Sequence, residues 1–379
     1  FHMTDSALTF FWVLSVYLAY RGLEDGKKPW WIWAGVAAAF GLMAKMVMIL
    51  IFPFLLLYLI YTKSWKAQSK NYILFVLITL LGFIPALIWN WQNNFDTFKH
   101  LAALSGGGGE SKPFDAGKSF GQFFEYIGGQ LAMISVFMLP LFVGAFRKTI
   151  LSQDRVKVYL LLPAVMSWAG FALLSFLTSI EVNWPVFAYG SLAILMAAWV
   201  CNQSLTWQKI RNWGVGLSIG LPLFFLLPDF TFIKSIPAIK KAEKSAFRRM
   251  AGYEPLAARL VSLQDSLGVH DAYIFSETYH MASELSFYLP EHPQTYMLNM
   301  GSRKNQFDLW PGLEQFVGKD EVGIFVSWNY ESPGEFADFQ ELIYEEELPI
   351  TFRDEPLRVA KIQVWRKLET FNPYMPDTY

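Results

Sequence analysis

The sequence predicts a polytopic α-helical membrane domain followed by a soluble α/β domain, and three observations support this fold class. First, 54% of the 379 residues are hydrophobic and only 17% are charged, whereas soluble domains carry about 25% charged residues. Second, apolar runs close to the length of a membrane span recur up to about residue 228. Third, beyond Pro228 charged residues become frequent and the apolar runs shorten to strand length. We therefore expect a membrane domain over residues 1–230 and a separate domain over residues 235–379.

The number of membrane spans depends on how the segment from Trp30 to Thr62 is divided. This segment is too long for one ordinary span of about 17 to 25 residues, and it carries Lys45 near its middle. If the chain turns at Lys45, four loops with basic residues fall on one side of the membrane, which is the cytoplasmic side by the positive-inside rule. The basic residues of these loops are Arg21, Lys27, Lys28, Lys63, Lys66, Lys70, Arg147, Lys148, Arg155, Lys157, Lys209 and Arg211. A single span would split them, so we predict about eight spans, near residues 6–20, 30–44, 46–62, 72–89, 130–146, 158–178, 185–201 and 213–228.

This topology places a small set of polar segments on the outer side of the membrane. They are Asp5, Lys45, the loop from Trp89 to Gln130, the short loop around Glu181 and Asn183, and everything after Pro228. We expect these segments to meet around one external cavity.

Asp5 is an isolated acid at the start of the first apolar run, FHMTDSALTFFWVLSVYLAY. A charge at such a border is costly unless it is hydrated, paired or used, which makes it a hypothesis for a functional site. The alternative is that Thr4 or Asp5 caps the helix N-terminus, which is the commoner use of Asp at a helix start. Lys45 has a comparable alternative, because a lysine near a helix end can simply extend its ammonium towards water.

The domain after residue 235 is predicted to alternate helices with strands, as in a small α/β sandwich. A helical pattern with a break near Tyr253 to Pro255 stops at Gly268, and a second helix covers Tyr279 to Tyr288. Strands are expected at Ala272–Phe275, Thr295–Leu298, Gly323–Ser327 and Arg358–Trp365. No GxGxxG, Walker or zinc pattern occurs here, which argues against a nucleotide or metal enzyme in this domain alone.

Charge, cysteine content and the first residues limit the remaining possibilities. The formal net charge of −1 gives no support for a nucleic-acid partner recognised through bulk charge. Cys201 is the one cysteine, so the chain can form no internal disulfide. The chain begins with Phe and has no basic leader before its first apolar run, so we expect an N-terminally truncated fragment of a longer protein.

Several segments together resemble polyprenyl-phosphate-dependent membrane glycosyltransferases, especially the bacterial group similar to dolichyl-phosphate-mannose mannosyltransferases and aminoarabinose transferases. They are TDSALTFF, AGVAAAFGLMAKMVMILIFP, PALIWNWQNNFDTFKH, NWPVFAY, YHMASELSFYLPEHPQTYMLN and RKNQFDLW. The resemblance implies a GT-C-like helix bundle in the bacterial inner membrane, with its active site on the extracytoplasmic face. It implies a polyprenyl-phosphate-linked sugar as donor, and as acceptor a lipid A or lipopolysaccharide molecule, another glycan or a protein.

The same resemblance assigns roles to individual residues. Asp5 matches the second of two essential acids, the first of which would lie upstream of this chain. Lys45 matches a lysine of the active-site cavity, where an ammonium suits a departing phosphate. His100 matches a cavity histidine that either binds a divalent metal or contacts phosphate, although a lone His is a weak metal signal. The remaining candidates for binding the substrate or the lipid phosphate are Asn90, Lys99, Asn183 and Arg303.

Two other classes of protein remain as alternatives. A transporter or flippase with an external domain would be favoured by broken helices and an ion site at the membrane midplane. Against it, the apolar runs show no clear internal repeat and no Asp or Glu deep within them. A scaffold that only binds a lipid-linked sugar is the third hypothesis, because the first acid is absent from this chain.

Overall fold

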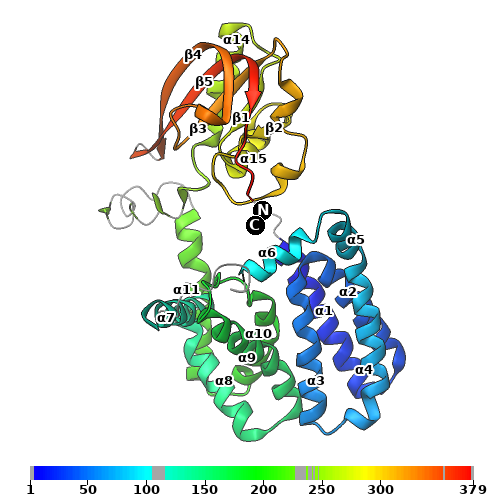
Figure 1. Cartoon of the computed structure of the whole chain (residues 1–379). Coiled ribbons are helices and arrows are strands. Elements are labelled where there is room, and N and C mark those ends of the chain that lie inside the picture. Colours follow the sequence, from blue (N-terminus) through cyan, green and yellow to red (C-terminus); the bar gives the residue numbers. More distant parts are fainter. Residues whose placement is uncertain are drawn as a thin grey trace. The chain divides into compact units, whose positions relative to one another are not determined.

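The chain divides into two units, residues Phe1–Leu226 and Leu227–Tyr379, in the computed structural model (Figure 1). The structure describes residues 4–104, 116–226, 236–237, 241, 244–245, 247–352 and 355–376. Each unit has a hydrophobic core of its own. We therefore describe the two units separately.

In its described residues the N-terminal unit consists of helices and the loops that join them. Its α-helices are α1 (Thr4–Asp25), α2 (Lys28–Ala44), α3 (Ile51–Tyr61), α4 (Trp65–Leu80), α5 (Ile84–Gln92), α6 (Asp96–Leu104), α7 (Ala116–Met133), α8 (Leu139–Ser152), α9 (Arg155–Ser175), α10 (Tyr189–Cys201) and α11 (Leu205–Leu226). Short 3₁₀ turns precede four of them: η1 (Met46–Leu50), η2 (Leu81–Phe83), η3 (Val136–Met138) and η4 (Val186–Ala188). Helices α1 to α4 lie side by side (Figure 1).

In the described part of the N-terminal unit the predicted spans fall mainly on helical segments, but fewer helices satisfy the requirements of a membrane span by length and composition. Among the described residues three do so: Thr4–Asp25, Trp65–Gln92 and Arg155–Ser175. A fourth would be the pair Ala116–Met133 and Val136–Ser152, which is bent by 72°. These helices fit a membrane protein, and the number of eight spans stays a prediction.

The bend of this pair interrupts the predicted run near residues 130–146. The break lies at Ser135, whose φ of 69° is positive, which is uncommon for a residue with a Cβ. The Ser135 hydroxyl accepts a hydrogen bond of 2.7 Å from Ser218 Oγ of α11. Residues up to Met133 therefore belong to α7, and those from Val136 onward belong to η3 and α8.

Small residues let the helices of this unit pack closely. A Cβ on Gly22 would lie 2.7 Å from the fully buried Trp31 ring, and one on Gly82 would lie 2.3 Å from the Ala39 carbonyl oxygen. Helices in a membrane associate through such close packing rather than through a hydrophobic driving force. Buried aromatic rings fill the centre of the unit, with Trp12 and Phe187 at 4.4 Å between centroids.

The two ends of the helix bundle differ in charge. Helix α1 starts beside Asp5 and rises about 30 Å before Asp25, at 1.5 Å per residue. Near its far end, Tyr58 and Tyr61 of α3 donate hydrogen bonds to the carbonyls of Arg155 and Gln153, both at 3.3 Å. Several of the loops with basic residues therefore gather at one end, and Asp5 lies at the other. We call these the basic end and the Asp5 end.

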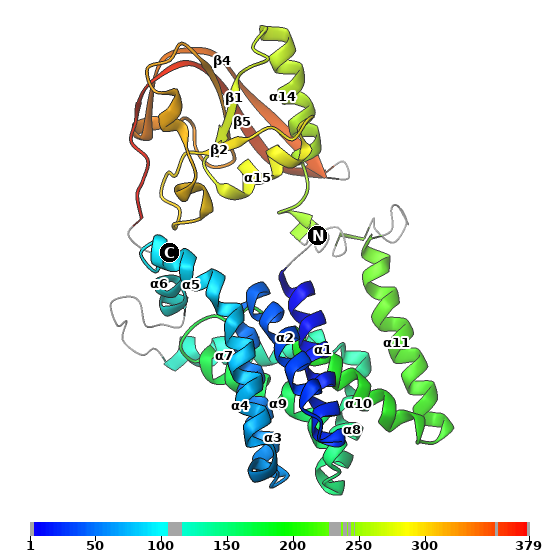
Figure 2. The ribbon, with the colours of Figure 1, turned by 90° about the vertical axis from the view of Figure 1, so that its right-hand side faces the viewer.

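The C-terminal unit contains a five-stranded mixed sheet with the strand order β2-β1-β3-β5-β4. The strands are β1 (Tyr273–Ser276), β2 (Thr295–Met297), β3 (Val322–Ser327), β4 (Ala337–Phe352) and β5 (Glu355–Phe371), and the helices are α14 (Tyr253–Leu267) and α15 (Tyr279–Tyr288). Strand β1 pairs in parallel with β2 and β3, whereas β5 runs antiparallel to β3 and β4. Figure 2 shows the long hairpin of β4 and β5 along one edge of the sheet.

Local signals explain where the two helices of this unit begin and end. Gly252 and Gly268, both with left-handed backbone (φ of 96° and 67°), flank α14. Thr278 caps α15 by accepting a hydrogen bond from Met281 N–H. Both helices contribute buried side chains to the core on one face of the sheet, and 3₁₀ turns η5 (Gln306–Leu309), η6 (Leu313–Phe316) and η7 (Gly334–Phe336) complete the unit.

Candidate functional site

The polar cluster at the Asp5 end joins three residues that are far apart in the sequence. Lys45 Nζ lies 2.7 Å from Asp5 Oδ1, and Asn183 Nδ2 donates a hydrogen bond of 3.3 Å to Asp5 Oδ2. Both carboxylate oxygens of Asp5 are thus held by side chains of other segments. We call Asp5, Lys45 and Asn183 the Asp5 cluster.

Lys45 occupies a break between two helical segments. Its backbone is extended, with φ of −160° and ψ of 131°, between the end of α2 and the start of η1. The Lys45 N–H still donates to the Gly41 carbonyl at 3.0 Å. A Cβ on Gly41 would meet the sulfur of Met48 at 2.8 Å, so the glycine leaves room for the chain to fold back. The ammonium is thereby presented at the end of α2 that faces Asp5.

Asn183 lies in the loop between α9 and η4, which a buried glutamine of α7 supports. Gln130 Nε2 donates to the Val182 carbonyl at 2.9 Å, and the Tyr189 hydroxyl donates to Gln130 Oε1. A Cβ on Gly129 would lie 2.7 Å from Val182, so glycine permits the close approach of α7. Sequence reasoning missed Gln130, although a lone amide at the start of the run QLAMISV was a signal.

The Asp5 cluster is electrically balanced and partly open to solvent. The side chains of Asp5 and Lys45 are 14% and 29% exposed. Partly buried charges interact more strongly than exposed ones, because water screens them less. A phosphate that approached Lys45 would compete with Asp5 for the same ammonium. The cluster therefore has one cation for an anionic group and one carboxylate that can accept a hydrogen bond from a hydroxyl.

Two other predicted site residues of this unit have structural partners nearby. Asn90 is almost fully buried, donates to the Ala86 carbonyl at 2.8 Å and accepts from Thr97 N–H at 3.1 Å. Lys99 Nζ lies 3.4 Å from Asp96 Oδ1. Asn90 thus fixes the turn between α5 and α6. In the part of the chain that the structure describes, no hydrogen bond or ion pair joins Asn90 or Lys99 to the Asp5 cluster.

The metal hypothesis rested on His100. The backbone of this residue belongs to α6, and its side chain lies outside the described residues. Over residues 4–104, 116–226 and the described parts of the C-terminal unit, no group of three or more His, Cys, Asp or Glu side chains is arranged to hold a metal ion. The metal role of His100 stays a prediction.

Arg303 belongs to the C-terminal unit. Its side chain is exposed in the segment after β2, and its carbonyl accepts a hydrogen bond of 3.2 Å from Asn305 Nδ2. Asn305 and Asp308 form a capping box at η5. This local network orders the backbone around Arg303 and leaves the guanidinium at the surface.

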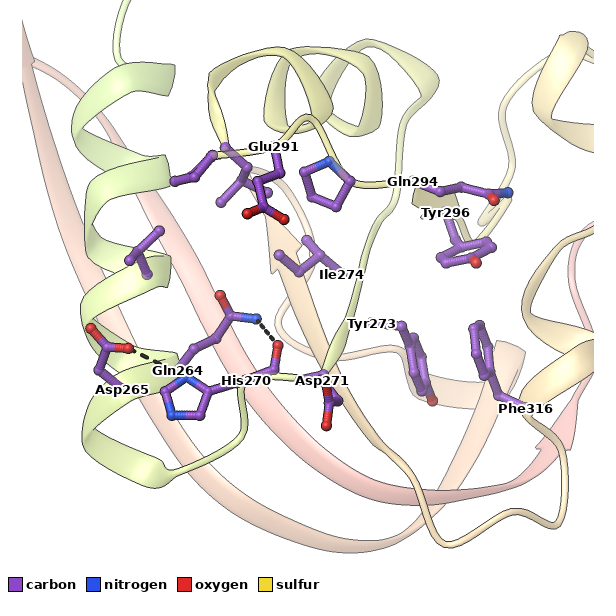
Figure 3. Close-up of a pocket in the computed structure, with 15 residues that line it drawn as sticks. Gln264, Asp265, His270, Asp271, Tyr273, Ile274, Glu291, Gln294, Tyr296 and Phe316 are labelled. Carbon is purple, nitrogen blue, oxygen red and sulfur yellow. Dashed lines mark hydrogen bonds and ion pairs between the residues drawn. The ribbon is translucent and has the colours of Figure 1, made fainter.

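The C-terminal unit also contains a cavity of about 780 Å³ beside the amino ends of β1 and β2. Figure 3 shows Ile274 in its middle, carboxylates of Asp265, Asp271 and Glu291 around it, and the rings of Tyr273 and Phe316 to one side. None of the residues that line it is Lys or Arg. Such a lining is unsuited to a phosphate, because like charges repel, and Arg303 is not part of it.

A buried carboxylate joins the opposite, carboxyl ends of β1 and β3. Glu277 Oε1 accepts hydrogen bonds from Trp328 N–H at 3.0 Å and Asn329 Nδ2 at 3.3 Å. Burial raises the pKa of the Glu277 carboxyl above its ordinary value, because removal from water penalises the charged form. This residue ties two strand ends together.

The helical unit and its long apolar helices fit a membrane protein. Residues 1–89 match the family model described as dolichyl-phosphate-mannose-protein mannosyltransferase. The matched region includes Asp5, Lys45 and helices α1 to α4, and it ends before Asn183. This match supports membrane glycosyltransferase activity in general. The comparisons with curated proteins and with solved structures give no match.

Proposed function

We propose that this protein transfers a sugar from a polyprenyl-phosphate-linked donor to an acceptor on the extracytoplasmic side of the bacterial inner membrane. The observation that supports this function best is the contact of 2.7 Å between Lys45 and Asp5. It lies within the region that matches the mannosyltransferase family, at the end of the bundle opposite the basic loops. A lipid A-like molecule or another lipid-anchored glycan is the proposed acceptor.

In the proposed reaction an acceptor hydroxyl oxygen forms a bond to the anomeric carbon of the sugar. The bond between that carbon and the donor phosphate oxygen breaks, and its electron pair leaves with the phosphate. Lys45 stabilises the charge that develops on this oxygen, which lowers the barrier when the cation is already in place. Asp5 orients the acceptor hydroxyl and holds Lys45. The hydroxyl proton passes to a carboxylate, the other of the two acids that the family resemblance implies.

The other predicted residues have supporting roles in this proposal. Asn183 fixes the orientation of the Asp5 carboxylate, which it contacts at 3.3 Å. Asn90 orders the turn that precedes α6, the helix that carries Lys99 and His100. Lys99 and His100 contact the lipid phosphate, with a divalent metal at His100 as a variant of this role. Arg303 binds a part of the substrate from the C-terminal unit.

Transfer of labelled sugar distinguishes this function from its two rivals. Membranes that contain the full-length protein are incubated with a polyprenyl-phosphate donor carrying a radiolabelled sugar and with extracted envelope glycolipid. We expect the label to move to the glycolipid. A transporter would instead move intact donor across the bilayer, and a scaffold would bind the donor without releasing its sugar, so either result with no transfer would contradict the proposal.

Cysteine labelling tests the proposed orientation. In a Cys201→Ser background, Glu181→Cys and Glu335→Cys are expected to react with an impermeant thiol reagent added outside, because both lie on the proposed outer side. Lys66→Cys at the basic end is expected to stay unlabelled until the membrane is opened. All three replaced side chains are exposed, so poor reactivity from burial is not a concern. The reverse labelling pattern would place the Asp5 cluster in the cytoplasm and exclude an outer active site.

A further inference from the structure

A groove on the surface of the N-terminal unit lies at the opposite end from the Asp5 cluster. It runs along α8, is bordered by Trp199 of α10 and Trp207 near the start of α11, and has a volume of about 670 Å³. Figure 1 shows α8, α10 and α11 grouped together. None of its lining residues belongs to the proposed catalytic site.

The groove is shaped by a glycine that faces a tryptophan. A Cβ on Gly144 would overlap the Trp199 ring at 2.3 Å, so only glycine lets this ring lie against α8. Trp207 packs on Trp199 with 5.0 Å between ring centroids, at an angle of 75°. The hydrogen bond from Ser218 to Ser135 holds α11 beside the start of α8. The groove is therefore built by packing contacts of three helices.

The lining is apolar along most of its length and cationic at one end. Val136, Val143 and Leu151 line it with 64%, 58% and 72% of their surfaces exposed. Arg147 and Lys148 add two positive charges near the end of α8. Among the described residues neither cation has a hydrogen bond or ion pair, whereas Arg21 and Lys157 are paired with Asp25 and Asp154.

We propose that this groove binds one anionic glycerophospholipid, with its phosphate at Arg147 and Lys148 and an acyl chain along α8 towards Val136. Helix α8 has 14 residues and so rises about 21 Å, which exceeds half of a hydrocarbon core of about 30 Å. The groove thus has the length and polarity of one leaflet. Basic pockets between membrane helices on the cytoplasmic side are known to bind anionic head groups.

Charge decides which lipid binds. Arg147 and Lys148 have no ion pair among the described residues, and no carboxylate lines the groove, so a headgroup with net negative charge is favoured. A zwitterionic choline headgroup would bring its own cation next to Arg147 and Lys148, which repel it. Each basic residue near an anionic lipid is expected to contribute about 5-fold in affinity, so the pair gives a preference of about 30-fold. This proposal requires a membrane-embedded chain and does not depend on sugar transfer.

The test measures lipid binding to the purified full chain by native mass spectrometry in mixed micelles. The probes are phosphatidylglycerol and phosphatidylcholine with identical acyl chains. We expect phosphatidylglycerol to bind about 30-fold more tightly to the unmodified protein, and Arg147→Gln with Lys148→Gln to remove that preference. Val143→Trp fills the groove without changing its charge, so it is expected to weaken both lipids. These positions are exposed, so the variants are expected to fold, which circular dichroism verifies.

Lys66→Gln with Lys70→Gln is the matched control. It removes two exposed positive charges from the same end of the bundle, outside the groove. The control is expected to keep the preference for phosphatidylglycerol. An equal loss in the control and in the Arg147 and Lys148 variant would show general charge attraction and overturn the proposal, and so would equal binding of the two lipids to the unmodified protein.

Discussion

Lys45→Ala is expected to lower the turnover number of sugar transfer by about 10²-fold to 10³-fold, the usual cost of losing one preorganised electrostatic contact to the transition state. The reason is that the ammonium interacts more strongly with the phosphate as the bond to the anomeric carbon breaks. An interaction that strengthens in the transition state changes kcat more than it changes substrate binding. The measurement is transfer from a purified lipid-phosphate donor, normalised to folded full-length protein, with kcat and KM determined separately.

Two further variants separate this role from that of a lysine that only reaches towards water. Lys45→Arg is expected to restore part of the activity, because a planar guanidinium does not reproduce the compact ammonium that contacts Asp5 at 2.7 Å. Lys66→Ala at the basic end is the matched control and is expected to retain full activity. If Lys45→Ala kept its turnover number, or if Lys45→Arg restored it completely, Lys45 would have no role in stabilising the leaving phosphate.

Asp5→Asn is expected to lower kcat by about 10²-fold, because it weakens the positioning of both Lys45 and the acceptor hydroxyl, and misplacement by about 1 Å can cost that much. The same substitution should leave the affinity for the donor unchanged or increase it. Removing the negative charge beside Lys45 leaves the ammonium free to attract the donor phosphate. The readout is the dissociation constant of the donor, measured by titration, together with kcat from the transfer assay.

The same substitution tests the helix-capping alternative. Asn and Asp are about equally good at a helix N-terminus, so a purely capping Asp5 would tolerate Asn with unchanged kcat. Asn183→Asp serves as a second probe, because it places a carboxylate 3.3 Å from Asp5 in place of a donor amide. We expect this variant to bind the donor less tightly than Asp5→Asn does. Unchanged kcat in Asp5→Asn would remove this acid from the reaction.

Much of the secondary structure could be predicted from the sequence, because its signals are local. The apolar runs located the helical segments of the N-terminal unit, and the count of basic loops located the break at Lys45. In the C-terminal unit, Gly268 and Thr278 mark the end of α14 and the start of α15. Helix Tyr279–Tyr288 was predicted with the bounds that the structure gives it.

Strand β4 was missed, and the reason lies in its position. Its run of Glu345, Glu346 and Glu347 has low strand propensity, so the segment reads as polar loop. It is an edge strand that pairs only with β5, and charged residues are common on such edges. Lys361 of β5 lies 3.1 Å from Glu345. Pairing with β5 therefore stabilises β4 as a strand, although the strand propensity of its own residues is low.

Local patterns in the sequence predicted a helical domain of membrane-protein composition, the positions of most helices and the chemical character of Asp5 and Lys45, because composition and periodicity are properties of nearby residues. Tertiary structure alone decided that Asp5 meets Lys45, 40 positions later in the chain, and Asn183, 178 positions later. It also decided that Gln130 supports the loop of Asn183, and that Arg147 and Lys148 border an apolar groove. Such contacts depend on how helices pack against one another, and helix packing is set by the fit of side chains from several segments at once.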